Sequence, residues 1–253
     1  MYDPILNDLR RGAVADALAA AEALAAERPD DAQALRWLSA AQLQSGQAEA
    51  ALASIDRAIA LAPEDAELHL ARAGVLVGSR KPDEARAALD QATGLDPNQF
   101  TAYVLQAQLA LARGDLDEAQ RLNRLAARVA PEHPRLAFVE GMVLLRQGDA
   151  EGALKILAAA VQRVPDDLQL LHALGVVYLA RGHLAFAEQA FRTIADRIPA
   201  ATGVTLLVAS VVARQGRSDE ALDVLNPVLE DPERLTAGVR GLAGRLHLRA
   251  GRL

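Results

Sequence analysis

The apolar residues of this chain recur three and four positions apart, in short segments separated by polar turns. Two such segments lie between Pro131 and Pro165. Their apolar positions are Leu136, Val139, Val143 and Leu144 in the first segment, and Ala153, Leu154, Leu157 and Val161 in the second. This spacing is that of one face of an α-helix. The stretch therefore predicts two amphipathic helices joined by a short turn.

The residues between these segments predict where each helix ends. Gly148 follows the first segment, at a place where glycine adopts a left-handed helix-ending conformation at little cost. Asp149 comes next and is a suitable N-cap for the second helix. Pro165 ends that helix because proline has no backbone N–H to donate. One unit is thus a helix, a tight turn, a second helix and a turn marked by proline.

The same arrangement returns every 34 residues, which predicts an internal repeat. The recurrent prolines are Pro29, Pro63, Pro97, Pro131, Pro165 and Pro199. The recurrent alanines are Ala17, Ala51, Ala85, Ala119, Ala153, Ala187 and Ala221. The turn glycines are Gly12, Gly46, Gly114, Gly148, Gly182 and Gly216, with Arg80 in the vacant slot. A fourth position always holds a small residue: Ser39, Ala73, Ala107, Gly141, Gly175 and Ala209.

The recurrent small residues have a packing explanation. Gly141 and Ala153 fall where the two helices of one unit are expected to cross, and a large side chain there would hold the backbones apart. Alanine and leucine dominate the apolar 51% of the chain, while aromatic residues make up only 3%. Such a composition favours closely stacked helices over one thick globular core. We interpret these positions as packing positions, not as a site.

One unit carries most of a known repeat signature. Its matching residues are Leu171, Leu174, Gly175, Tyr178, Gly182, Ala187, Phe191 and Pro199. The chain therefore resembles the tetratricopeptide repeat family, although this unit lacks the first tryptophan of the signature and has Ile194 at the third small position. The resemblance implies an all-α, right-handed superhelical solenoid of antiparallel helix pairs. It also implies a concave groove lined mainly by the first helix of each pair.

The period places the whole chain, residues 1–253, in a single array. The predicted parts are a partial unit at 1–29, full units at about 32–65, 66–99, 100–133, 134–167, 168–201 and 202–235, and a final unpaired helix at about 233–250. In the partial unit, a short segment at 4–11 precedes a second-type helix at 13–26.

Two units depart from the pattern. In the second unit, Arg80 stands in the glycine slot and Pro82 follows closely, so we expect the first helix to end about two residues early and Pro82 to begin the next helix. In the sixth unit, Pro227 lies inside the second helix. We expect a kink or an early stop near Asn226, because proline removes a donor and clashes with the preceding turn.

The end of the array carries apolar residues where a solenoid normally has a polar cap. They are Val239, Leu242, Leu246 and Leu248. We interpret this end either as part of a longer protein or as a face covered by a partner, and self-association through uncapped ends is a further possibility.

Charge and composition limit the function. The formal net charge is -6, and no basic stripe suits the phosphates of a nucleic acid. The related pentatricopeptide RNA-binding repeat has a period of 35 and would need a basic groove, so it fits less well. Cysteine is absent, which excludes thiolate chemistry. No signal peptide or membrane-length apolar run is evident, and we expect a cytoplasmic protein that binds neither nucleic acid nor membrane.

Catalytic or cofactor chemistry finds no support in the pattern. The five histidines are His69, His133, His172, His183 and His247, and none has the spacing of a metal site. His172 alone falls on the predicted concave face, where a packing role is the simpler interpretation. Acidic pairs such as Glu64-Asp65 sit at helix starts, where they complement the helix dipole. We expect no enzyme, no metal and no cofactor.

The family resemblance places the groove on particular positions of each first helix. The resulting candidate residues are Arg36, Val104, Gln108, Leu111, Arg135, Phe138, Met142, Leu145, His172, Val176, Leu179 and Leu206. The lysine, asparagine and arginine clamp with which some members grip a chaperone's C-terminal carboxylate is absent from these positions. The middle of the groove is apolar, and apolar patches of this kind often mark an interface. The alternative is a narrow groove whose apolar residues pack on neighbouring helices.

These observations predict a scaffold that binds a peptide or helix of a partner protein in the apolar groove. The alternative function is a non-catalytic module of a larger enzyme, such as a transferase or an oxygenase, to which such arrays are often joined. A long extension of the chain past Leu253 would favour the alternative.

Overall fold

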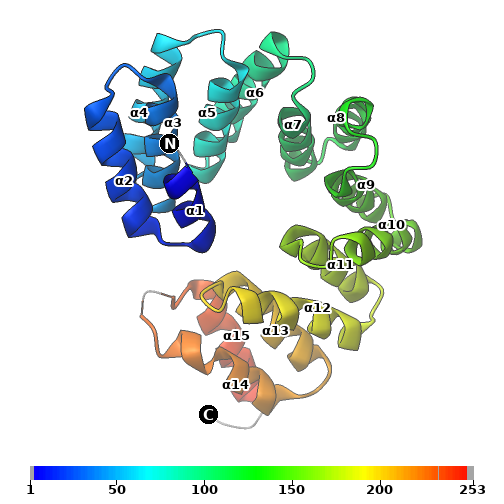
Figure 1. The fold of residues 1–253 in the computed structure, drawn as a ribbon. Helices are drawn as coiled ribbons and strands as arrows, with labels where there is room; N and C mark the ends of the chain where they lie inside the picture. Colours follow the sequence, from blue (N-terminus) through cyan, green and yellow to red (C-terminus); the bar gives the residue numbers. More distant parts are fainter. Residues whose placement is uncertain (1–2, 233, 250–253) are drawn as a thin grey trace. The chain divides into compact units, whose positions relative to one another are not determined.

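The computed structural model describes residues 3–232 and 234–249, and over these residues the chain forms fifteen α-helices and no strand. The chain divides into two compact units, Met1–Glu132 and His133–Leu253, and their boundary lies one residue before the predicted boundary between the repeats 100–133 and 134–167. Figure 1 shows the consecutive helices of each unit packed side by side in chain order. The predicted all-α solenoid of antiparallel helix pairs is thus confirmed within each unit.

The helix bounds follow the 34-residue period. In the first unit they are α1 (Asp3–Arg11), α2 (Val14–Glu27), α3 (Ala32–Gln44), α4 (Ala48–Leu61), α5 (Ala66–Gly78), α6 (Pro82–Leu95), α7 (Phe100–Arg113) and α8 (Leu116–Val129). In the second unit they are α9 (Pro134–Arg146), α10 (Ala150–Arg163), α11 (Leu168–Ala180), α12 (Leu184–Arg197), α13 (Thr202–Arg214), α14 (Ser218–Leu229) and α15 (Ala237–Arg249).

The ends of the helices carry the residues that the sequence indicated. The carboxylate of Asp149 accepts a hydrogen bond from the Gly152 N–H at 2.8 Å and caps α10. Asp65 and Asp167 cap α5 and α11 in the same way. All six turn glycines have positive φ, between 74° and 90°. The tight turns are therefore set by local backbone chemistry.

The second full repeat, residues 66–99, keeps the regular 34-residue spacing. The prediction that its first helix ends early is therefore wrong. Helix α5 ends at Gly78, 34 residues after α3 ends at Gln44. Arg80 itself takes the left-handed conformation, with φ of 59°, in the slot that glycine fills elsewhere. Pro82 is the first residue of α6, as predicted. The turn geometry is preserved because packing imposes it on an unfavourable residue.

The proline in α14 shortens the helix but does not stop it near Asn226. Helix α14 continues through Pro227 to Leu229 and has 12 residues, against 14 in α12. Beyond the proline, the Glu230 N–H still bonds to the Asn226 carbonyl oxygen at 3.0 Å. The helix survives because Pro227 lies near its end, where few backbone bonds depend on it.

The last helix begins later than expected. Both expected ends, Glu233 and Ala250, lie outside the described residues, and α15 begins at Ala237, after Thr236. This start is 35 residues after that of α13 at Thr202, one residue more than the period.

The face of α15 is also less open than the sequence suggested. Of its four apolar residues, Val239, Leu242 and Leu246 are buried, and Leu248 is 62% exposed. The expected apolar end therefore reduces, over the described residues, to one exposed leucine.

Close helix crossings hold each pair together. All seven recurrent alanines have no exposed surface. At the helix crossing in the first full repeat, residues 32–65, the Ser39 hydroxyl donates to the Ala51 carbonyl oxygen at 2.7 Å. A Cβ atom placed on Gly141 would lie 2.6 Å from Leu157 Cγ, and one on Gly175 would lie 2.7 Å from Phe191 Cε1. The packing interpretation of these positions is thus supported by contact.

We predict that Gly175→Ala lowers the free energy of unfolding by about 1–3 kcal/mol, because the new methyl group meets the fully buried Phe191 ring. Gly244→Ala is the matched control in the same unit, since nothing lies within 4 Å of its Cβ position. The control is expected to gain about 0.5–1 kcal/mol through helix propensity. Urea denaturation measures both, and equal effects would contradict the crossing argument.

Arg80→Gly is expected to raise the free energy of unfolding by about 1 kcal/mol, because glycine takes the left-handed conformation without steric cost. The reciprocal change in the next repeat, Gly114→Ala, is expected to lower it by a similar amount. Thermal and urea denaturation of the two variants measure this difference, and a loss of stability in Arg80→Gly would show that the arginine side chain supports the turn.

Candidate functional site

The candidate residues on the first unit lie mostly inside the protein. Val104 and Leu111 are buried, with 1% and 6% of their surface exposed, and Gln108 is half-buried. Arg36 is also half-buried, donates to Glu67 at 3.4 Å and lies 4.8 Å from the centre of the Trp37 ring. Val104 and Leu111 therefore serve packing in this structure and offer no surface to a ligand, which corrects their expected place in an open groove.

The candidate residues on the second unit remain partly exposed. Each of the six apolar residues is half-buried, and together we call them the α9–α13 apolar surface: Phe138, Met142, Leu145, Val176, Leu179 and Leu206. Three of them pack against the core around Leu157 and Leu174, and the other three pack against the core around Phe191. Residues 34 positions apart occupy equivalent places on α9, α11 and α13. The surface is thus apolar and partly covered, and its residues follow the 34-residue register from α9 to α13.

Two polar candidates accompany this surface. Arg135 is exposed, and its backbone N–H donates to the His133 ring, which caps α9. His172 is exposed at one side, and its ring centre lies 5.8 Å from that of Phe191. Surrounding protein atoms exclude water from part of the ring, which lowers the pKa of His172. His172 is therefore neutral at pH 7 and acts as a polar neighbour of the core.

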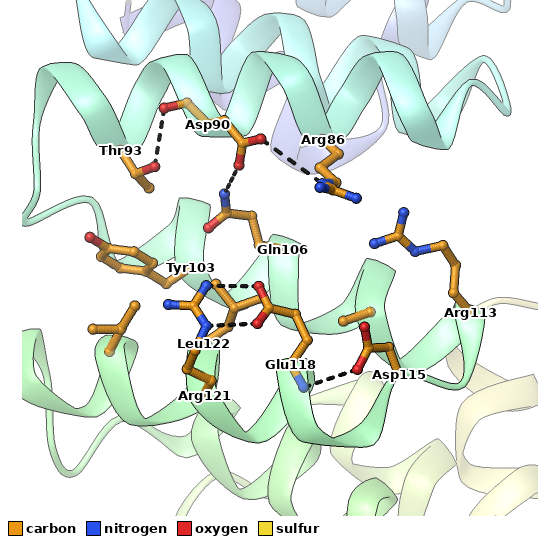
Figure 2. Close-up of a pocket in the computed structure, with 12 residues that line it drawn as sticks. Arg86, Asp90, Thr93, Tyr103, Gln106, Arg113, Asp115, Glu118, Arg121 and Leu122 are labelled. Carbon is orange, nitrogen blue, oxygen red and sulfur yellow. Dashed lines mark hydrogen bonds and ion pairs between the residues drawn. The ribbon is translucent and has the colours of Figure 1, made fainter.

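A separate cavity lies on the first unit, between α6, α7 and α8 (Figure 2). We call it the α6–α8 pocket, and its volume is about 440 Å³. Its lining residues are Arg86, Asp90, Thr93, Tyr103, Gln106, Ala110, Arg113, Asp115, Glu118, Arg121, Leu122 and Leu125. It contains three arginines and three carboxylates, so the pocket is strongly polar without a net formal charge.

The carboxylate of Glu118 is held at one side of this pocket. Arg121 donates to both of its oxygens, at 2.6 and 2.7 Å. These hydrogen bonds lower the pKa of Glu118, and the positive charges of Arg86 and Arg113 lower it further. Glu118 is therefore ionised at neutral pH and cannot act as a general acid there.

One contact among the lining residues of the pocket has a counterpart in the preceding repeat. The Gln106 amide donates to Asp90 Oδ1 at 2.7 Å, and Arg72 donates to Asp56 Oδ1 at the same distance. Each residue of the first pair stands 34 positions after its counterpart. The repeat pattern did not predict this site, although a polar Gln106 within the apolar helix 100–113 was a signal of it.

A third polar cluster ties α12 to the turn between α13 and α14. The nearly buried carboxylate of Glu188 accepts from Arg192 at 2.8 Å, from Gln215 at 2.8 Å and from Arg217 at 2.7 Å. Burial by itself raises the pKa of Glu188, but these three hydrogen bonds outweigh burial and the net pKa lies below the ordinary value. The carboxylate is therefore permanently ionised at neutral pH and has a structural role.

Comparison with sequence families agrees with this architecture. One sequence model of the tetratricopeptide repeat matches residues 5–66, 70–134 and 119–168, and a second matches residues 144–211. The chain belongs to the tetratricopeptide repeat family. Repeats of this family generally form scaffolds that bind other proteins, and this tetratricopeptide repeat protein is an interaction scaffold in that general sense. No curated protein matches the chain.

Solved structures show the same fold at low sequence identity. A tetratricopeptide repeat protein from Parabacteroides merdae superimposes with a TM-score of 0.73 and 14% identity, over 98% of this chain and 97% of the other. A thermophilic protein of the same repeat type from Thermus thermophilus gives 0.64 and 21%, over 72% and 99% of the chains. A structure of the Cut9–Hcn1 hetero-tetramer of APC/C gives 0.75 and 15%, over 89% of this chain.

The chain spans 45% of the length of the chain it matches in the Cut9–Hcn1 structure. At these identities the comparisons establish the fold of this tetratricopeptide repeat protein and nothing of its partner. Among the described helices, none combines the length and the apolar character needed to cross a membrane.

We predict that Glu188→Gln lowers the free energy of unfolding at pH 7 by about 1–3 kcal/mol, because its three donors lose a charged acceptor. The ionised carboxylate stabilises the fold above its ordinary pKa of 4.5, and this contribution is lost as the pH falls through the lowered folded-state pKa. The difference between variant and parent should therefore shrink in acid, as urea denaturation at pH 7 and pH 3 measures.

Glu118→Gln is the control for this prediction, because its ion pair is more exposed and is expected to contribute at most about 1 kcal/mol. A Glu188→Gln variant as stable as the parent at pH 7 would show that the network contributes no net stability.

Proposed function

We propose that this protein is a binding scaffold whose α9–α13 apolar surface takes a helix or an extended apolar peptide of a partner protein. The observation that carries the proposal is the partial exposure of all six residues of that surface. Leucines elsewhere in the same helices, such as Leu170, are fully buried. Six apolar side chains left part-exposed at equivalent positions suit a surface that another apolar face covers.

The composition of the surface favours an adaptable apolar contact. Phe138 supplies a large rigid side chain, and Met142 on the same helix is flexible enough to fit different neighbours. An amphipathic helix presents anchors at helical spacing, which the three apolar residues of α9, the two of α11 and the one of α13 can accept. Arg135 is exposed on the first of these helices and can pair with an acidic group of the ligand.

Binding is favoured over catalysis by the state of the ionisable groups. The pKa values of Glu118 and Glu188 are lowered by hydrogen bonds, which keeps both carboxylates ionised. The pKa of His172 is lowered by burial, and its ring contacts the core residue Phe191. Over the described residues, no group of three histidine, aspartate or glutamate side chains is arranged to hold a metal ion. These groups stabilise the repeat, and the apolar surface remains as the candidate for function.

A photo-reactive phenylalanine analogue at Phe138 tests the proposal directly, because it keeps the ring and reacts only with what lies against it. We expect it to crosslink a partner protein in cell extract, whereas the same analogue at the exposed Ala159 of α10 is expected to give none of that product. Mass spectrometry identifies the crosslinked peptide. Equal products from both positions would remove this surface from consideration.

Met142→Glu provides a second measurement with the partner identified in this way. Burying the new carboxylate against an apolar ligand is expected to weaken binding by at least about tenfold. Ala159→Glu is the matched control, since it adds the same charge on an exposed position. Circular dichroism checks that both variants keep their helices. Unchanged affinity in a folded Met142→Glu variant would contradict the proposed surface.

A further inference from the structure

The α6–α8 pocket contains a buried polar atom that the fold leaves without a partner. Gln106 is 8% exposed, and its amide nitrogen is used by Asp90. Its Oε1 atom is buried and has no hydrogen-bond partner among the described residues. Buried acceptors are nearly always satisfied in folded proteins, because an unpaired one loses its bonds to water. Gln106 lines the cavity while its oxygen is covered, so a donor from outside the chain could pair with this oxygen once the side chain turns toward the cavity.

Two arginines of the pocket also keep unused donors. Arg86 Nε lies 3.9 Å from Asp90 Oδ2, and Arg113 Nη1 lies 3.7 Å from Asp83 Oδ1. Both distances are too long for a hydrogen bond. Figure 2 shows the two guanidinium groups at the same side of the pocket, with the end of the Arg113 side chain directed toward Arg86. Two like charges with free N–H groups facing one space favour an anion between them.

Arg121, in contrast, is an arginine of this pocket whose donors are paired with a carboxylate. It donates to both oxygens of Glu118, at 2.6 and 2.7 Å, in the two-pronged geometry that suits a carboxylate. Arg86 and Arg113 have only the longer ion pairs with Asp90 and Asp83, and among the described residues no carboxylate accepts two hydrogen bonds from either of them. A carboxylate brought by a ligand would give them the contact that Arg121 already has.

We propose that the α6–α8 pocket binds an acidic side chain of an extended peptide from a partner protein. Its carboxylate lies between Arg86 and Arg113, and a backbone N–H of the same peptide donates to Gln106 Oε1. Because this oxygen is covered in the structure, the Gln106 side chain swings toward the pocket when the peptide binds.

The mixed charge of the pocket favours a peptide over a free polyanion. Asp90, Asp115 and Glu118 line the same space and would repel a phosphate-rich ligand. The same carboxylates accept hydrogen bonds from peptide N–H groups. The volume of about 440 Å³ also exceeds what one carboxylate group fills and has room for adjoining residues. A single carboxylate on a polypeptide therefore matches both the donors and the acceptors.

This proposal is independent of the α9–α13 apolar surface, because it concerns residues 86–125 of the first unit alone. Its failure leaves the proposed function untouched, and variants of Met142 are expected to leave it unchanged.

The test uses the full chain and the blocked peptide acetyl-Gly-Glu-Gly amide as the probe, followed by NMR of the arginine Nε–H and glutamine amide signals. We expect saturable shifts of the Arg86, Arg113 and Gln106 signals. The uncharged peptide acetyl-Gly-Gln-Gly amide is expected to bind at least about tenfold more weakly, as the loss of a charged hydrogen-bonded pair implies. Equal binding of the two peptides would overturn the proposal.

Variants separate the parts of the site. Arg86→Gln combined with Arg113→Gln is expected to weaken the acidic peptide by at least about tenfold, whereas Arg57→Gln, an exposed arginine of α4, should have no effect. Gln106→Leu removes the unpaired oxygen and is expected to weaken binding without lowering the melting temperature. Unchanged binding in the double variant would contradict the site.

Sodium acetate and inorganic phosphate serve as small-anion probes in the same titration. If either reproduces the shifts at the concentration at which the acidic peptide acts, the pocket takes a small anion and the assignment of a peptide is wrong. Weak or absent shifts with both, together with saturation by the acidic peptide, support the peptide.

Discussion

The structure depends on the close crossing of two helices within each repeat. At the crossings of the six full repeats, one helix contributes a fully buried alanine of the recurrent series and the other contributes a small residue such as Ser39 or Gly175. The short distance lets a large neighbour, such as Phe191, fill the space beside the crossing and contact the backbone itself. Because these helix pairs cross at such short range, the turns, the helix caps and the repeat register have to fit the geometry of the crossing.

Packing at the crossings explains why the chain tolerates residues whose backbone preference does not suit their position. Arg80 adopts a left-handed conformation because the helices on either side of it are already placed by their crossing. Pro227 is tolerated near the end of α14, where its neighbours Leu225 and Val228 are buried. The charged network around Glu188 adds a polar tie where the turn between α13 and α14 meets α12. At Arg80 and Pro227, packing between helices outweighs the backbone preference of the residue.

Function is left to the positions that the crossing does not use. The apolar residues on α9, α11 and α13 keep part of their surface, and the polar residues between α6 and α8 surround a cavity. A repeat of this kind can vary such positions without changing its fold, since each helix pair is specified elsewhere. The two proposed sites therefore differ in chemistry although they are built on the same framework.

The sequence by itself determined the repeat, the helix pairs, the turn glycines and the family, because these follow from residues at fixed spacing that act on their immediate neighbours. It also indicated the half-buried apolar residues of the second unit. Only the tertiary structure decided that Val104 and Leu111 are buried and that Gln106 Oε1 lacks a partner beside Arg86 and Arg113. These facts depend on how side chains of different helices meet, and a period along one chain specifies which faces meet but not how closely each side chain is covered.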